Sequence, residues 1–229
     1  MFKYPLVVTI DTNIFDAAKY NLSDASTLRI LENHVKSGKI KVVLSDIVVQ
    51  ESKRHIAARV KEVCGIVNIA RNSALKVYNE HLISSIGMNE MFRIVESEDD
   101  IIAKEEKVFD DFLCAIDAEI LGTDLIDINS VLSDYFGAKP PFEESGKKKS
   151  EFPDAFIAQQ IRNRFGETET VVIVSNDKGF IRACRESENH LFFNSLGALY
   201  NAISKEDAAY DDTIAVIKEL QLRISAAVK

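Results

Sequence analysis

Two short apolar segments, each followed by an acidic residue, most constrain the fold of this chain. Residues 5–10 read Pro-Leu-Val-Val-Thr-Ile and lead directly into Asp11, and residues 170–174 lead through Ser-Asn to Asp177. Runs of this kind, rich in β-branched residues and without alternation, are typical of buried parallel strands. We therefore predict a parallel sheet with acidic residues just beyond the carboxyl ends of two of its strands.

The rest of the chain alternates between predicted strands and helices. Further strands are expected at 40–44 and 190–193. Helices are expected around Leu28–Val35 and at about 46–86, 98–121, 153–166, 178–184, 195–204 and 209–227. Strand followed by helix followed by strand is the opening of an α/β fold. We predict one α/β domain over 1–204 with a helical insertion at about 61–146, and a C-terminal helix over 205–229.

The composition excludes several classes of protein. Of the 229 residues, 46% are hydrophobic and 28% are charged, which is the balance of a folded globular protein. The formal net charge of −8 excludes a generally basic nucleic-acid coat, so any contact with a phosphate backbone must be local. We find no signal peptide and no apolar run near the roughly 20 residues that span a bilayer, and expect a cytoplasmic protein with no membrane partner. Three widely spaced cysteines fit neither a disulfide framework nor a zinc site.

Acidic residues recur at positions that a parallel sheet brings together. Asp11 and Asp177 follow strands, Glu51 lies on the helix after the second strand, and Asp154 follows Pro153 at a helix start, with Glu151 three residues earlier. Neighbouring carboxylates resist joint ionisation unless a counter-charge is present. Oxygen-only ligands select Mg²⁺ or Mn²⁺, so the pattern predicts a divalent metal site.

Each acid also has a structural explanation. Asp177 is a suitable N-cap, Asp154 is favoured in a first helical turn, and Glu51 alone would be an ordinary solvated helix residue. Glu151 is equally well explained as a ligand or as a loop carboxylate. The four principal acids taken together favour the metal site.

The order of these acids and their surroundings resembles the PIN domain family of metal-dependent ribonucleases. The segment Asp11-Thr12-Asn13 resembles that family's Asp-x-Asn start, and Ser175-Asn176-Asp177 with Phe180 resembles its Ser-x-Asp-x-x-Phe ending. Glu51 and the pair Asp154-Ala155 match the family's second and third acids. The variant with a long helical stretch after Glu51 is similar to a larger bacterial PIN-like subfamily.

The resemblance implies an α/β/α sandwich with a central, mainly parallel sheet. It implies that Asp11, Asp154 and Asp177 hold Mg²⁺ or Mn²⁺, with Glu51 direct or through water and Asn13 and Ser175 in support. The implied activity is endonucleolytic hydrolysis of RNA, more readily single-stranded, to 5′-phosphate and 3′-hydroxyl ends. A toxin or phage-defence role, an antitoxin or other protein partner, and a homodimer stay open, as does DNA as substrate. The alternative is a catalytically inactive PIN-like module that binds RNA or a protein.

Two basic clusters lie close in sequence to the proposed ligands. Lys53 and Arg54 follow Glu51, together with His55, Arg59 and Lys61, and Lys147, Lys148 and Lys149 precede Glu151. Lys178 follows Asp177 directly. These cations are candidates for guiding RNA to the metal, although solvated lysines are the simpler interpretation. The four histidines have no spacing typical of a metal site or triad, and only His55 lies near a proposed ligand. A dehalogenase-like phosphatase is disfavoured because Asn13 stands where its second Asp is needed.

Overall fold

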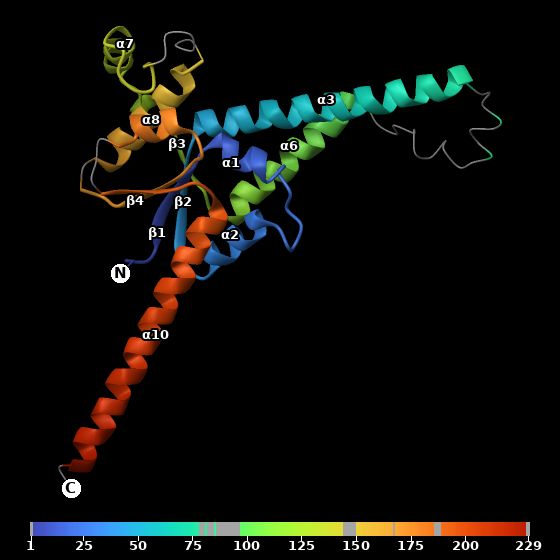
Figure 1. Ribbon diagram of the computed structural model, residues 1–229. Coiled ribbons are helices and arrows are strands. Elements are labelled where there is room, and N and C mark those ends of the chain that lie inside the picture. Colours follow the sequence, from blue (N-terminus) through green and yellow to red (C-terminus); the bar gives the residue numbers. More distant parts are fainter. Residues whose placement is uncertain are drawn as a thin grey trace.

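The computed structural model describes residues 2–77, 81, 85, 97–143, 150–166, 168–185 and 189–227, and for 219 and 222–227 it describes the backbone alone. A parallel sheet lies at the centre, and two long helices extend from it in different directions (Figure 1). The strands of the sheet are β1 (Leu6–Ile10), β2 (Ile40–Ser45), β3 (Glu119–Leu121), β4 (Val171–Val174) and β5 (His190–Phe193).

Helices connect these strands and cover the sheet. They are α1 (Thr12–Ala17), α2 (Thr27–Lys36), α3 (Asp46–Val77), α6 (Glu98–Ala115), α7 (Ile128–Phe136), α8 (Phe152–Phe165), α9 (Lys178–Ala183) and α10 (Leu196–Ala227), with a 3₁₀ turn η1 (Thr123–Leu125). The strand order and the right-handed rule for crossovers between parallel strands together put α1, α2 and α6 on one face and α8 and α9 on the other. The described part of the chain is therefore the expected three-layer α/β/α sandwich (Figure 1).

Within the described residues the strand order is β3-β2-β1-β4-β5, and every pairing is parallel. The four residues of β4 are fully buried, as its continuous apolar sequence predicts. The chain runs outward from β1 to β3 in one direction and then returns to β4 on the other side of β1. The order thus reverses between β1 and β4, and an open parallel sheet binds its ligands at the carboxyl ends of such a pair of strands.

The four predicted strands are confirmed. The sheet also contains a fifth described strand, β3, which lies within the range predicted as a helix. The helix predicted over 98–121 ends at Ala115, and Glu119–Leu121 forms β3 beside β2. Asp117 has a φ of 46° there, a left-handed conformation that stops the helix and that Asp tolerates better than most residues. Three residues are too few to produce a strand signal in the sequence.

The two helices predicted at 195–204 and 209–227 are one continuous helix, α10. Its first turns pack into the core through Leu196, Leu199 and Ile203. The helix then continues away from the sheet (Figure 1). No described helix is both long enough and apolar enough to cross a membrane.

The insertion after β2 is an arm of two helices. α3 runs outward for 32 residues, and α6 returns along it toward β3 (Figure 1). Lys53 on α3 pairs with Asp110 on α6 at 2.7 Å. The first turns of α3 lie beside the sheet, directly after β2, and its outer half extends away from the sheet (Figure 1).

Candidate functional site

The carboxyl ends of β1 and β4 meet at the point where the strand order reverses. Ile10 is opposite Val174 in the register, and the backbone N–H of Asp11 donates to the Val174 carbonyl at 3.0 Å. The backbone N–H of Ser175 in turn donates to the Phe193 carbonyl at 3.0 Å. The pairing of the strands thus fixes the positions of Asp11 and Ser175 relative to each other.

Asp11 is buried and held by two side chains. Its Oδ2 accepts hydrogen bonds from Ser175 Oγ and from Asn13 Nδ2, each at 2.5 Å. Asn13 Nδ2 also donates to Ser175 Oγ at 3.2 Å. Burial raises the pKa of Asp11 to about 6 even though the hydrogen bond from Ser175 favours the ionised form, and the charge of Asp177 raises the pKa further. The side chains that orient the carboxylate, Ser175 and Asn13, are both neutral.

Asp177 is an N-cap, as its structural explanation proposed. Its Oδ1 accepts from the backbone N–H groups of Gly179 at 2.6 Å and Phe180 at 2.9 Å. Both bonds reach the same oxygen, and the residue is exposed, so the cap orients the carboxylate without covering it. A Cβ at Gly179 would lie 3.1 Å from Asp177 Oδ1 and 4.0 Å from Glu151 Oε2. Gly179 therefore lies close to the carboxylates of both Asp177 and Glu151.

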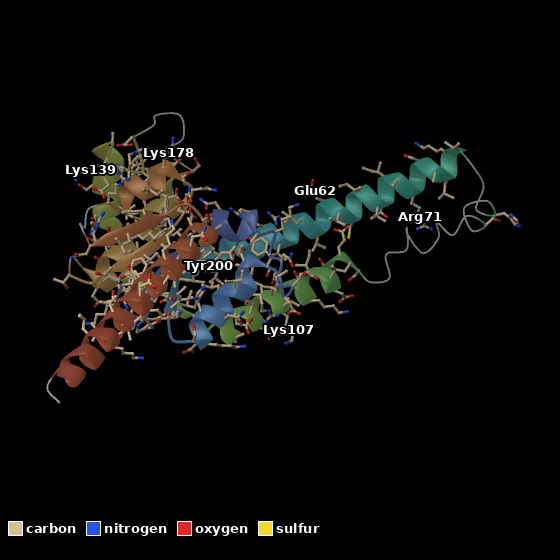
Figure 2. The ribbon with its side chains drawn as sticks, turned by 60° about the horizontal axis from the view of Figure 1, so that its bottom comes forward. Glu62, Arg71, Lys107, Lys139, Lys178 and Tyr200 are labelled. Carbon is tan, nitrogen blue, oxygen red and sulfur yellow. The ribbon has the colours of Figure 1, made fainter. Side chains whose placement is uncertain are left out.

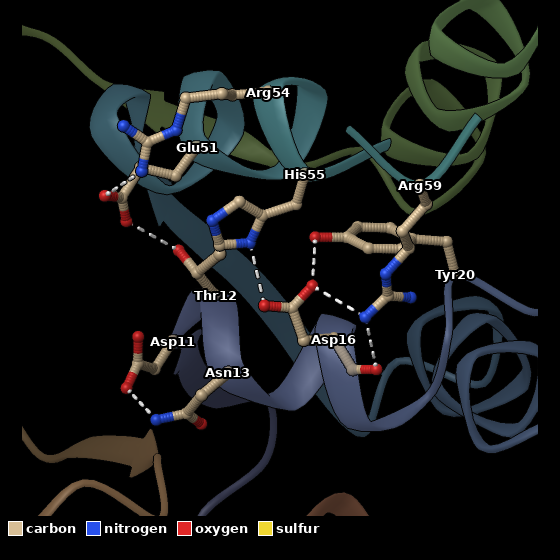
Figure 3. Close-up of polar contacts among 9 residues, drawn as sticks. All are labelled: Asp11, Thr12, Asn13, Asp16, Tyr20, Glu51, Arg54, His55 and Arg59. Atoms are coloured by element: carbon tan, nitrogen blue, oxygen red, sulfur yellow. Dashed lines mark hydrogen bonds and ion pairs between the residues drawn. The ribbon is translucent and has the colours of Figure 1, made fainter. Parts of the chain in front are cut away.

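Glu51 reaches the site from the second turn of α3. Its Oε2 accepts from Thr12 Oγ1 at 3.1 Å, so the residue directly after Asp11 holds the Glu51 carboxylate (Figure 3). Arg54 Nη2 lies 3.4 Å from the other oxygen, Oε1. The contact with Thr12 links α3 to the end of β1.

Asp154 lies among the other acids. It is in the first turn of α8, which begins beside Pro153. Burial raises the pKa of Asp154 to about 8, and four neighbouring charges add to that effect: Asp11, Asp177, Glu151 and Glu51. All five predicted acids therefore lie close enough to interact, although they come from four different parts of the chain.

This donor set fits a hard divalent cation. It consists of carboxylate oxygens, which suit Mg²⁺ and Mn²⁺. Burial raises the pKa values of Asp11 and Asp154, and the charges of the neighbouring carboxylates raise them further. Over the described residues, no three Asp, Glu, His or Cys side chains are close enough together to hold an ion as they stand. The acids converge, and binding would require them to move closer together.

The predicted basic residues differ in their surroundings. Lys53 is paired with Asp110, whereas Arg54 is largely exposed and has only a long contact with Glu51. Lys178 is exposed beside Asp177 and lies with Lys139 at the end of the molecule away from the arm (Figure 2). Lys147, Lys148 and Lys149 lie outside the described residues.

Two polar residues near the site were not singled out by the sequence. Gln160 on α8 is fully buried, and its Nε2 donates to Asp46 Oδ1 at 2.7 Å and to the Gly122 carbonyl at 3.0 Å. It thereby joins α8 to the ends of β2 and β3. Asp16 at the end of α1 contacts His55 and Arg59 on α3 (Figure 3). Neither residue belongs to a recognisable local motif, since each acts through partners distant in the sequence.

Comparison with known proteins identifies one family. A family model described as PIN domain matches residues 8–180, a range that contains all five acids. No curated protein and no solved structure matches the chain.

Proposed function

Because the chain belongs to the PIN domain family, whose members are generally nucleases, we propose that it is a Mg²⁺- or Mn²⁺-dependent endoribonuclease. The observation that carries the proposal is the position of Asp154. Its pKa is raised by burial and by four other carboxylates that the fold brings to the point where the strand order reverses. Such uncompensated charge is destabilising and therefore favours a functional site that binds a cation.

The side chains of the proposed site have distinct roles. Asp11, Asp154 and Asp177 are the proposed ligands, with Glu51 and Glu151 at the edge of the site. Ser175 and Asn13 hold Asp11, Thr12 holds Glu51, and the helix cap holds Asp177, so three of the five carboxylates are oriented by hydrogen bonds. Binding of a cation would then draw the acids closer together. A bound divalent cation would supply activation of water and compensation of charge on the leaving 3′-oxygen.

The substrate must approach an acidic protein through local positive charge. Arg54 and Lys178 are exposed near the acids and are the proposed contacts for RNA phosphates. Lys53 contributes less because Asp110 offsets its charge. The cluster Lys147–Lys149 remains a proposed contact on sequence grounds. Toxin, defence and processing roles would all use the same site.

The test is cleavage of a fluorescent single-stranded RNA by the purified protein with Mn²⁺ or Mg²⁺. We expect cleavage to stop with EDTA and to fall by at least about a hundredfold in Asp11→Asn and in Asp177→Asn, since each variant removes a charged ligand. Asp24→Asn is the matched control, because Asp24 is a fully exposed acid outside the site. This control should retain full activity.

Two results would contradict the proposal. Equal cleavage by the wild type and by Asp11→Asn would indicate a contaminating nuclease. RNA binding without metal-dependent cleavage would instead favour the inactive binding module.

A further inference from the structure

A polar network that the proposed hydrolysis does not use lies one helical turn beyond Glu51. Asp16, at the end of α1, contacts His55 on α3, with 2.8 Å between Asp16 Oδ2 and His55 Nδ1. Residues four apart on a helix share a face, so His55 lies on the face of α3 that carries Glu51 (Figure 3). His55 is partly exposed, with 35% of its side chain accessible.

Asp16 is held firmly by further contacts. Its Oδ1 accepts from Tyr20 Oη at 3.0 Å and from Arg59 Nη2 at 3.1 Å, and its backbone carbonyl accepts from the same Arg59 nitrogen at 3.1 Å. The Arg59 guanidinium in turn lies over the Tyr20 ring, 5.2 Å from its centre. Arg59 thus offsets the charge of Asp16, while the position of the carboxylate is fixed.

These contacts determine what His55 offers to a substrate. An ionised carboxylate accepts hydrogen bonds and donates none, so the contact with Asp16 places a proton on His55 Nδ1. In a neutral imidazole the second nitrogen, Nε2, is then an acceptor. In Figure 3 this nitrogen points away from Asp16, on the side where Glu51 and Thr12 lie.

A hydrogen-bond acceptor next to the cleaved phosphate can distinguish the 2′-hydroxyl of a nucleic acid from its phosphate oxygens. Phosphate oxygens only accept hydrogen bonds, whereas the 2′-hydroxyl of RNA also donates and is absent from DNA. We propose that His55 Nε2 accepts a hydrogen bond from a ribose 2′-hydroxyl next to the cleaved phosphate, so that the site selects RNA over DNA. His55 is then a substrate-contacting residue and Asp16 a positioning residue. This inference rests on the proposed nuclease function.

The test compares an all-ribose RNA with the same strand carrying 2′-deoxy nucleotides on both sides of the cleaved bond. We expect the wild type to cleave the all-ribose strand about three- to tenfold faster, which is the effect of one hydrogen bond. His55→Leu should cleave both strands at the same, lower rate. Asp16→Asn should also lose the preference. Its amide oxygen would stay with the donors Tyr20 and Arg59, so its NH₂ group would donate to His55 Nδ1 and move the ring proton to Nε2. His34→Leu is the matched control, since His34 packs on Tyr200 away from the acids, and it should keep the preference.

The outcomes separate the two hypotheses. If His55→Leu keeps the full preference for ribose, the inference is wrong while the nuclease assignment stands. If the wild type cleaves neither strand, the proposed function is wrong. Binding of the same two strands, measured by fluorescence anisotropy, then tests the inference. Equal affinity of the wild type for both strands would overturn it. A preference of the wild type for the all-ribose strand that is lost in His55→Leu would support it.

Discussion

The Ser175 hydroxyl donates a 2.5 Å hydrogen bond to Asp11 Oδ2, joining residues 164 positions apart in the chain. The contact exists because β1 and β4 are neighbours in parallel register, which places the residues after them side by side. It orients the most buried of the site's carboxylates and favours its ionised form.

Ser175→Ala removes this hydrogen bond. The pKa of Asp11, already raised to about 6, should rise further because burial is then less opposed. The acidic limb of the pH–activity profile should move to higher pH, with a loss of activity of about tenfold at neutral pH. The measurement is the cleavage rate across pH, and Ser23→Ala, an exposed position, should leave the profile unchanged.

Stability without metal should depend on Asp154. Its pKa is about 8 in the folded protein against an ordinary 3.8, so between these values the folded state binds more protons than the unfolded chain. The free energy of unfolding should therefore fall as pH rises through this window. Asp154→Asn should weaken the fall, and thermal melting in EDTA across the window measures it. A wild-type melting temperature that stays constant across this pH window would contradict the raised pKa of Asp154.

Addition of Mg²⁺ or Mn²⁺ should restore the stability that the protein loses as pH rises. Because a cation binds the ionised acids of the folded state, the rise in melting temperature should be larger near about pH 8 than near about pH 5. Asp11→Asn should reduce the rise and Asp24→Asn should not. If the melting temperature rose equally in the wild type and in Asp11→Asn, the cation would bind at a site that does not include Asp11.

Gly179→Ala should impair activity more than stability. The new methyl group would lie 3.1 Å from Asp177 Oδ1, so this oxygen would have to shift by a few tenths of an ångström, whereas the distance of 4.0 Å to Glu151 Oε2 is an ordinary contact. We expect weaker activation by metal in titrations of the cleavage rate, with little change in melting temperature. Gly197→Ala is the matched control, since nothing lies within 4 Å of the added atom. Equal activity of both variants would show that a small shift of the Asp177 carboxylate does not affect the reaction.

Gln160→Leu should destabilise the fold. It would leave Asp46 Oδ1 and the Gly122 carbonyl without the amide that joins α8 to the ends of β2 and β3. Loss of such a buried donor costs about 1–3 kcal/mol, measurable by urea unfolding. Gln50→Leu, at an exposed position of α3, should change the free energy of unfolding by less than about 0.5 kcal/mol.

The parts of the fold that could be predicted have strong local signals. The buried strands around Val8 and Ile173 contain continuous β-branched runs, and the helix start at Pro153 has a recognisable first turn. The positions of Asp11 and Asp177 also followed from local sequence, because residues that come just after a parallel strand lie at the carboxyl edge of the sheet.

The features that were missed depend on distant partners. β3 is a strand because it pairs with β2, and its three residues carry no pattern of their own. Asp16 contacts His55 and Arg59, which lie 39 and 43 positions further along the chain, and Gln160 contacts Asp46 across 114 positions. A single sequence contains no signal for such pairs.

The length of α3 has a mechanical consequence. Glu51 lies in the second turn of a helix of 32 residues, which is about 48 Å long. In the inner half of the helix, Glu51 contacts Thr12, Lys53 contacts Asp110, and both His55 and Arg59 contact Asp16. A given change in the direction of the helix at these contacts would therefore move its outer turns much further than it moves Glu51.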